Sequence, residues 1–142
     1  MPDDNTLTAR EFDHLSQDVW NSLLPLIPEE LKAHFQKIHI LIEDVATEEL
    51  LAELGQDDVS EDPLSLCGLY VGVPLTESSV TFPSLLPDRV YLFRQALLDL
   101  ADYDGGASSR RRLREEIAVT LLHEIGHFFG LSEEDLERLG YD

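Results

Sequence analysis

The sequence predicts a single α+β domain, and three observations lead to that prediction. At 142 residues the chain has the length of one domain with one core. Segments with helical spacing alternate with three short apolar runs typical of strands, and a long helical pattern follows them. With 43% hydrophobic and 27% charged residues, the composition is that of a globular protein. We therefore expect residues 1–142 to form one domain, with residues 1–7 disordered.

The first third of the chain predicts two helices followed by a strand. Thr8 opens a capping box, and apolar residues then recur every three or four positions, which is typical of an amphipathic helix that Pro25 ends. Two glutamates directly after Pro28 favour a second, short helix to about Phe35. The run Ile38–Ile42 is nearly all apolar, which predicts a strand buried on both faces.

The rest of the chain predicts two further strands and more helix. A short helix is expected at Leu50–Leu54. The strand Cys67–Val73 is expected at an edge of the sheet, because a proline follows it and its two glycines favour a bulge or a close backbone approach. Arg89–Phe93 predicts a third strand, which leads into a helix over 95–101. The last long helix is expected at Arg110–Phe129, with Ser108 or Ser109 as its cap.

Charge limits the classes of partner. The chain carries 29 Asp and Glu against 10 Lys and Arg, a net charge of -19. Because Lys and Arg supply most of the affinity for nucleic acids and anionic membranes, this balance argues against both kinds of partner. The single cysteine, Cys67, cannot form an intrachain disulfide, and no apolar stretch is long enough to cross a bilayer. We therefore expect a cytoplasmic protein, as a monomer or a homodimer.

The one basic cluster lies at the start of the long helix. Arg111 and Arg112 stand four residues before Glu115 and Glu116, a spacing that favours ion pairs along a helix. A solvated face with salt bridges is expected, and binding of an anionic partner is the alternative.

The sequence His123-Glu124-Ile125-Gly126-His127 predicts a metal centre on the long helix. Two histidines at positions i and i+4 lie on one face of a helix, within reach of a single zinc ion. Glu124 follows the first histidine and is placed to act as general base toward a water molecule at the zinc. The alternative is that neighbouring carboxylates bind both histidines, which then have only a structural role.

A third ligand is expected shortly after the second histidine. Glu133 lies six residues after His127, where the extended H-E-x-x-H-x-x-G-x-x-(H/D) pattern has its last ligand. Glu134 and Asp135 are the alternatives, although acidic residues in the first turn of a helix capped by Ser132 also stabilise the helix without any metal.

Four segments of the chain resemble the bacterial mini-zincins, also called the zincin-like metallopeptidase family, which was once catalogued as a domain of unknown function. The segments are L-I-P-E-E-L, C-G-L-Y-V-G-V-P-L, L-P-D-R-V-Y-L-F and H-E-I-G-H-F-F-G-L-S-E-E-D-L-E-R-L-G-Y. The resemblance implies a minimal zincin fold, in which a small mixed sheet packs on the active-site helix. It also implies a zinc site and peptidase chemistry.

The chain departs from this family at one place and from larger zincins at another. Members often have aspartate at the third-ligand position, where this chain has Glu133. Larger zincins support the site with a methionine turn, whereas the only methionine here is Met1, so Tyr141 is a candidate to pack beneath the histidines instead.

The predicted function is therefore that of a zinc-dependent metallopeptidase. By analogy with zincins, an extended peptide would add to the edge strand at Leu69–Pro74, although this strand can equally be one that only faces the core. The alternative function is a catalytically silent zincin-like domain that takes part in protein interaction. A third possibility, a mimic of nucleic acid, rests on the negative charge alone.

Overall fold

The computed structural model describes residues 7–27, 29–53, 65–71 and 88–128, apart from the side chains of Glu30, Leu31, His34, His127 and Phe128. Its helices are α1 (Ala9–Leu23), the 3-10 helix η1 (Leu24–Leu26), α2 (Glu29–Phe35), α3 (Glu48–Glu53), α4 (Arg94–Leu100) and α5 (Ala107–Phe128). Its strands are β1 (His39–Glu43), β2 (Gly68–Val71) and β3 (Arg89–Phe93). Within these residues each predicted helix and strand is confirmed, with ends that differ by a few positions.

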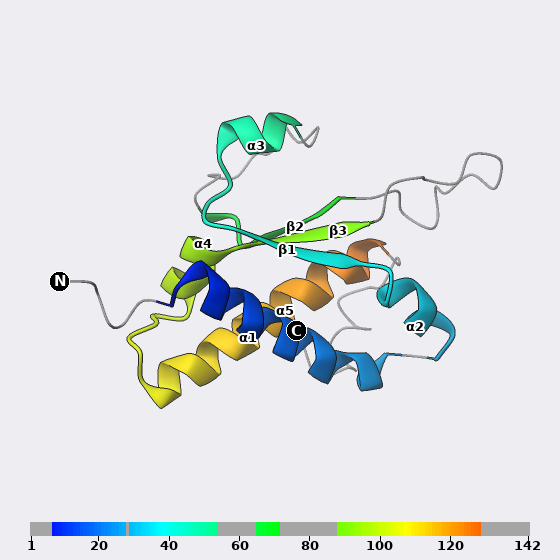
Figure 1. Ribbon diagram of the computed structural model, residues 1–142, viewed down its shortest axis with the longest axis horizontal. Helices are drawn as coiled ribbons and strands as arrows, with labels where there is room; N and C mark the ends of the chain where they lie inside the picture. The colour runs from blue at the N-terminus through cyan, green and yellow to red at the C-terminus, as the bar shows by residue number, and fades with distance from the viewer. Residues whose placement is uncertain (1–6, 28, 54–64, 72–87, 129–142) are drawn as a thin grey trace.

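The three strands form one mixed sheet in the order β1-β3-β2. The central strand β3 pairs in parallel with β1 and antiparallel with β2. Helices α1 and α5 lie along one face of the sheet, and α3 lies on the other side (Figure 1). Among the strands that the structure describes, β2 lies at an edge, as predicted, and a small mixed sheet packs on the long helix.

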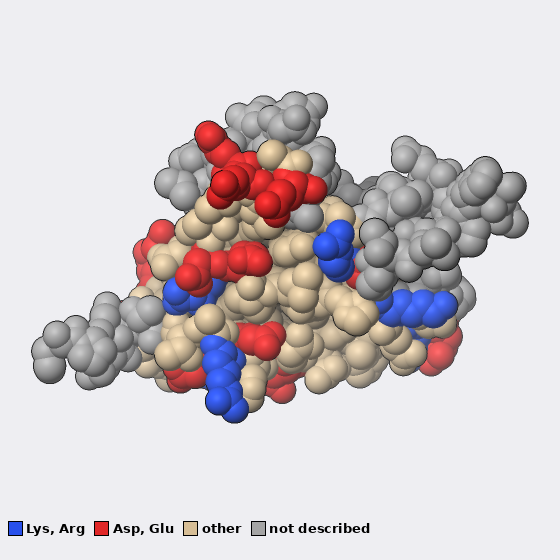
Figure 2. Space-filling model, turned by 45° about the horizontal axis from the view of Figure 1, so that its top comes forward, with Lys and Arg blue, Asp and Glu red and all other residues tan. Residues whose placement is uncertain are grey.

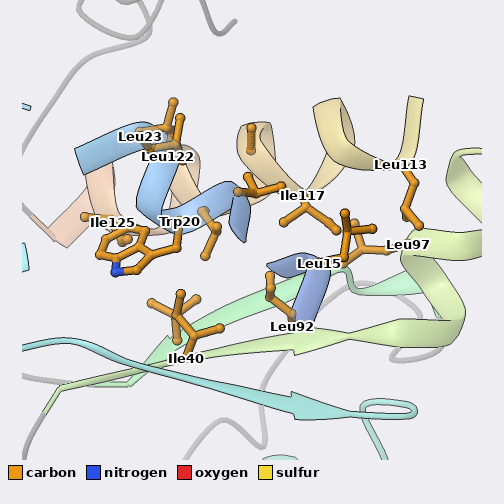
Figure 3. Close-up of a cluster of buried hydrophobic side chains, with 14 of the residues drawn as sticks. Leu15, Trp20, Leu23, Ile40, Leu92, Leu97, Leu113, Ile117, Leu122 and Ile125 are labelled. Atoms are coloured by element: carbon orange, nitrogen blue, oxygen red, sulfur yellow. The ribbon is translucent and has the colours of Figure 1, made fainter. Parts of the chain in front are cut away.

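The main core fills the space between α1, α5 and the sheet (Figure 3). Along α5, Leu113, Ile117, Leu121 and Ile125 recur every four residues, and each is fully buried. This spacing directs one face of the helix at the sheet, because residues four apart lie nearly above one another. A second, smaller cluster on the opposite face contains Tyr91 and Phe93 of β3 together with residues of α3 and α4, among others.

The prediction that the first strand is buried on both faces is wrong. Ile40 is buried, whereas His39 and Leu41 are exposed, the latter by 38%. The physical reason is that β1 is an edge strand, and within the described residues the second cluster covers the central strand instead. It is β3 that has both faces buried, with Val90 and Leu92 toward α5.

The N-terminal end of α1 is fixed to the sheet. Thr8 and Glu11 form the predicted capping box, with hydrogen bonds of 3.1 Å in both directions. Leu7, the residue directly before Thr8, is buried. Its carbonyl oxygen accepts a hydrogen bond of 2.7 Å from the Arg94 guanidinium. The same guanidinium pairs with Asp44 at 2.9 Å. Arg94 thus connects the start of α1 with the segment after β1.

The N-terminus of α5 differs from the prediction that Ser108 or Ser109 caps it. The helix begins earlier, and the Asp104 carboxylate accepts hydrogen bonds from the Gly106 amide at 2.8 Å and from the Ser109 hydroxyl at 2.6 Å. The Ser109 bond is the main cause that lowers the pKa of the Asp104 carboxyl, and the Gly106 bond adds to it. A preceding aspartate therefore supplies the acceptor that the sequence assigned to a serine.

The lowered pKa of Asp104 predicts a contribution to acid unfolding. This contribution stabilises the folded chain above the ordinary aspartate pKa, about 3.9, and is lost as the pH falls through the lower folded value. The unfolding free energy of Asp104→Ala, measured in urea between about pH 6 and pH 2, should therefore fall less on acidification than that of wild type. The unfolding free energy of Ser109→Ala should also fall less on acidification than that of wild type. Parallel curves of unfolding free energy against pH for all three proteins would contradict the role of Asp104 as the hydrogen-bond acceptor.

Ser16 of α1 predicts a stabilising substitution. Its side chain is fully buried, and its hydroxyl has no hydrogen-bond partner within the described part of the chain. Because an unpaired buried hydroxyl costs free energy, Ser16→Ala should raise the unfolding free energy by about 1 kcal/mol. Ser22→Ala is the control, since the Ser22 hydroxyl donates to the Val19 carbonyl at 2.6 Å. A loss of stability in Ser16→Ala would show that this hydroxyl is paired.

The basic cluster at the start of α5 contacts other elements. Arg112, which the sequence paired with Glu116, instead donates to the Ala101 carbonyl oxygen at 3.0 Å. Arg114 forms an ion pair of 2.9 Å with Asp18 of α1. The reason is that the carbonyl end of α4 carries partial negative charge and lies beside the first turns of α5, so the guanidinium satisfies it.

Acidic side chains gather on the surface over α3 (Figure 2). The acidic residues of this helix are Glu48, Glu49 and Glu53, and all three are exposed. Thr47 caps the helix through a hydrogen bond of 3.1 Å from the Leu50 amide. The described residues contain no helix long and apolar enough to cross a membrane.

Candidate metal centre

The predicted metal-binding motif lies in the last turns of α5, beside the edge strand β2. Three consecutive core positions of this helix, Ile117, Leu121 and Ile125, are fully buried toward the sheet. The polar positions between them are only half-buried, and these are Thr120, His123 and Glu124. Because these residues are three or four positions apart, they form a polar stripe along the helix, next to the apolar one. The structure places Thr120 and Glu124 of this stripe against β2.

Gly68, the first residue of β2, allows the strand to approach α5 closely. A Cβ atom at this position would lie 2.5 Å from Thr120 Cγ2 and 3.6 Å from Glu124 Cγ. The first of these distances is far shorter than any real contact between carbon atoms. The close backbone approach that the sequence proposed for this strand is therefore confirmed, and it occurs at the motif.

The backbone of β2 presents alternate amides to β3 and away from it. The Phe93 amide donates to the Cys67 carbonyl at 2.9 Å, which makes Cys67 and Phe93 a hydrogen-bonded antiparallel pair. Along an antiparallel strand every second residue repeats this pattern, so Leu69 also faces β3 and Tyr70 faces outward. The outward amide of Tyr70 donates a hydrogen bond of 2.9 Å to Glu124 Oε1. The motif glutamate thus binds the edge of the sheet.

The side chain of Tyr70 lies on the same face of β2 as Gly68 and packs against the main core. Burial raises the pKa of its phenol strongly, and the hydrogen bond that the phenol donates to Asp88 and the negative charge of Asp88 raise it further. Asp88 directly precedes β3, whose Val90 is the register partner of Tyr70. The phenol therefore keeps its proton at neutral pH.

Of the predicted ligands, the structure describes the side chain of His123 alone. This residue is half-buried, and its Nε2 atom is buried. The backbone of His127 belongs to α5, one turn further along, but its side chain lies outside the described part. Glu133 and Tyr141 also lie outside the described residues, as do the alternative ligands Glu134 and Asp135. Within the described residues no group of three or more His, Cys, Asp or Glu is placed to hold a metal ion.

A family model of zincin-like metallopeptidases matches residues 35–141, which is more than half of the chain. The chain belongs to the zincin-like metallopeptidase family. The matched range contains all three strands, α5 and the position of Glu133. A comparison with curated proteins found no match.

In this zincin-like protein the mixed sheet packs on the helix that carries the motif, as the resemblance implied. Reasoning from the sequence expected a bulge or a close approach at this strand but did not name Thr120 as the partner of Gly68, and it missed the bond from the Tyr70 amide to Glu124. A glycine within a strand pattern was the signal for the first. The second had no signal in the sequence, because every residue except proline has a backbone amide that can donate.

Proposed function

We propose that this zincin-like protein is a zinc-dependent peptidase in which Glu124 is the general base. Family membership supports peptidase chemistry. The observation that carries the proposal is the position of Glu124, which is half-buried on α5, adjacent to His123 and 2.9 Å from the outward amide of an edge strand. A carboxylate one residue after a ligand histidine can accept a proton near the metal without binding it.

The donor set fits zinc. His123 and His127 occupy positions one turn apart on α5, the spacing at which two imidazoles bind one ion. The Nε2 atom of His123 is buried, which suits a nitrogen that binds metal and is shielded from water. A third ligand would come from the residues after α5, and we propose Glu133, with Glu134 and Asp135 as alternatives.

Each residue of the proposed site has a separate role in peptide hydrolysis. Zinc bound at this site would polarise the carbonyl of the peptide bond and lower the pKa of a water molecule to about 7. Glu124 would take a proton from the attacking water and deliver it to the leaving amine. Tyr141 would support the two histidines from below. One zinc ion per chain is expected.

The outer edge of β2, to which the structure pairs no other strand within the described residues, is our candidate for the peptide-binding surface. It is an edge strand of the sheet and lies beside α5 at Glu124, so an extended peptide that adds to it would bring its backbone close to the motif. We further propose a cytoplasmic location, since the one cysteine, Cys67, cannot form an intrachain disulfide. The net charge of -19 supports peptide rather than nucleic acid or membrane as partner.

The test of this proposal is a zinc titration of chelator-stripped protein by calorimetry, followed by incubation of the loaded protein with a diverse peptide library. We expect binding of one zinc ion per chain and cleavage of library peptides, detected by mass spectrometry. Absence of zinc binding by the wild-type chain would overturn the proposal. Stoichiometric zinc without cleavage of any peptide would favour the catalytically silent interaction domain.

A further inference from the structure

We propose that Gly68 positions the general base: its missing side chain lets β2 approach α5 until the Tyr70 amide holds the Glu124 carboxylate. Glu124 is thus fixed from outside its own helix. This inference deepens the proposed function, on which it rests for the role of Glu124 as a base. It concerns residues of the edge strand that the H-E-x-x-H motif does not contain.

The first step is the distance between the strand and the helix. A Cβ at position 68 would meet Thr120 Cγ2 at 2.5 Å and the Tyr91 carbonyl oxygen at 3.2 Å. The Tyr91 oxygen belongs to the backbone of the central strand, which cannot move without disturbing the sheet. An added methyl group would therefore push β2 away from α5, or push the Thr120 side chain aside.

The second step is the direction of the Tyr70 amide. Gly68 and Tyr70 are two residues apart, so they share one face of β2 and one edge of the ladder. A shift of the strand at Gly68 therefore moves the Tyr70 amide as well. Its 2.9 Å bond to Glu124 Oε1 has a charged acceptor, which makes it stronger than an ordinary backbone bond.

The third step is the consequence for the carboxylate. A glutamate side chain on a helix surface has three rotatable bonds, and a hydrogen bond to a backbone amide in a sheet restricts them. With Oε1 engaged at the strand, the carboxylate is held in place for proton transfer. A peptide that adds to β2 would then pair with backbone groups of the strand other than the Tyr70 amide.

The first experiment measures amide hydrogen exchange by NMR in the chelator-stripped full chain, and again with zinc. The Tyr70 amide should exchange about tenfold faster in Glu124→Ala than in wild type, because its acceptor is gone. In Glu124→Gln the side-chain carbonyl still accepts, so most of the protection should remain. The Leu69 amide, which faces β3, is the internal control and should change little. Equal rates for Tyr70 in wild type and Glu124→Ala would overturn the proposal.

The second experiment tests the glycine. Gly68→Ala should raise the Tyr70 exchange rate about as much as Glu124→Ala does, and Gly68→Ala/Thr120→Ser should restore slow exchange because serine lacks the Cγ2 atom. Leu69→Ala, which removes a side chain from the opposite face of the same strand, should leave the Tyr70 rate within about twofold of wild type. Unchanged Tyr70 exchange in a folded Gly68→Ala protein would remove the role of Gly68. If Gly68→Ala does not fold, the double variant is measured instead. Slow Tyr70 exchange in a folded double variant would support the proposal, and fast exchange would contradict it.

These measurements separate the inference from the proposed function. Exchange at Tyr70 requires neither zinc nor a substrate, so it reports the contact of strand and carboxylate alone. A protected Tyr70 amide in a protein that binds no zinc would leave the contact standing and overturn the peptidase proposal. An unprotected Tyr70 amide in an active peptidase would overturn the contact and leave the peptidase proposal standing.

Discussion

Glu124→Gln is expected to lower peptide hydrolysis by about 10²–10⁴-fold while zinc affinity stays near that of wild type. Glutamine has the same size and can still accept the Tyr70 amide bond, so the site keeps its shape. It cannot take a proton from water, so only the chemical step is lost. The measurement is kcat and KM on a library peptide that wild type cleaves, together with calorimetric zinc binding.

Glu116→Gln is the matched control for this substitution. It makes the same chemical change on the same helix, two turns before Glu124, and Glu116 is also half-buried. We expect its kcat and KM to equal those of wild type within about twofold. A Glu124→Gln protein as active as wild type would contradict the role of Glu124 as general base. Equal losses in both variants would indicate a general effect of the charge of the helix.

His123→Ala is expected to abolish one-to-one zinc binding. After the loss of one of three protein ligands, the remaining two cannot bind zinc at micromolar zinc concentrations. In wild type, zinc at about one hundred times its Kd should stabilise the fold by about 2.7 kcal/mol, which corresponds to a rise in Tm of about 5–10 °C. In His123→Ala this rise should be absent. Thermal melting with and without zinc provides the check beside calorimetry.

Two further variants complete this comparison. His39→Ala removes an exposed histidine of β1, outside the motif, and should bind zinc as wild type does. Glu133→Ala should bind zinc more weakly if Glu133 is the third ligand, whereas unchanged affinity would shift that role to Glu134 or Asp135. Zinc binding by His123→Ala with wild-type affinity would contradict the site itself.

Helices and strands followed from short stretches of sequence because their causes are local. The capping box of α1 is formed by residues three apart, and the apolar face of α5 repeats every four residues, so both can be recognised without knowing the neighbours. The edge position of β2 was likewise predicted from its own glycines and the proline that follows. The motif His123-Glu124-Ile125-Gly126-His127 belongs to the same class, since its chemistry depends on spacing within one helix.

Two of the predictions that were wrong concern contacts with other elements of the fold. Ile38–Ile42 is apolar enough for a strand buried on both faces, yet its edge position in the sheet leaves Leu41 exposed. Arg112 had a glutamate four residues along its own helix, but its guanidinium donates to the carbonyl oxygen of Ala101, directly after α4. In both cases the residues were known from the sequence, but the packing of other elements determined what their side chains contact.

What the sequence by itself determined is the α+β domain, its elements and the helix that carries the motif. What only the tertiary structure decided is the partner of Glu124. Tyr70 is 54 residues away along the chain, and it donates through its backbone amide, a group that every residue except proline carries. Which amide meets the carboxylate depends on the register of β2 with β3 and on the close approach at Gly68. These are set by long-range packing, which no local pattern encodes.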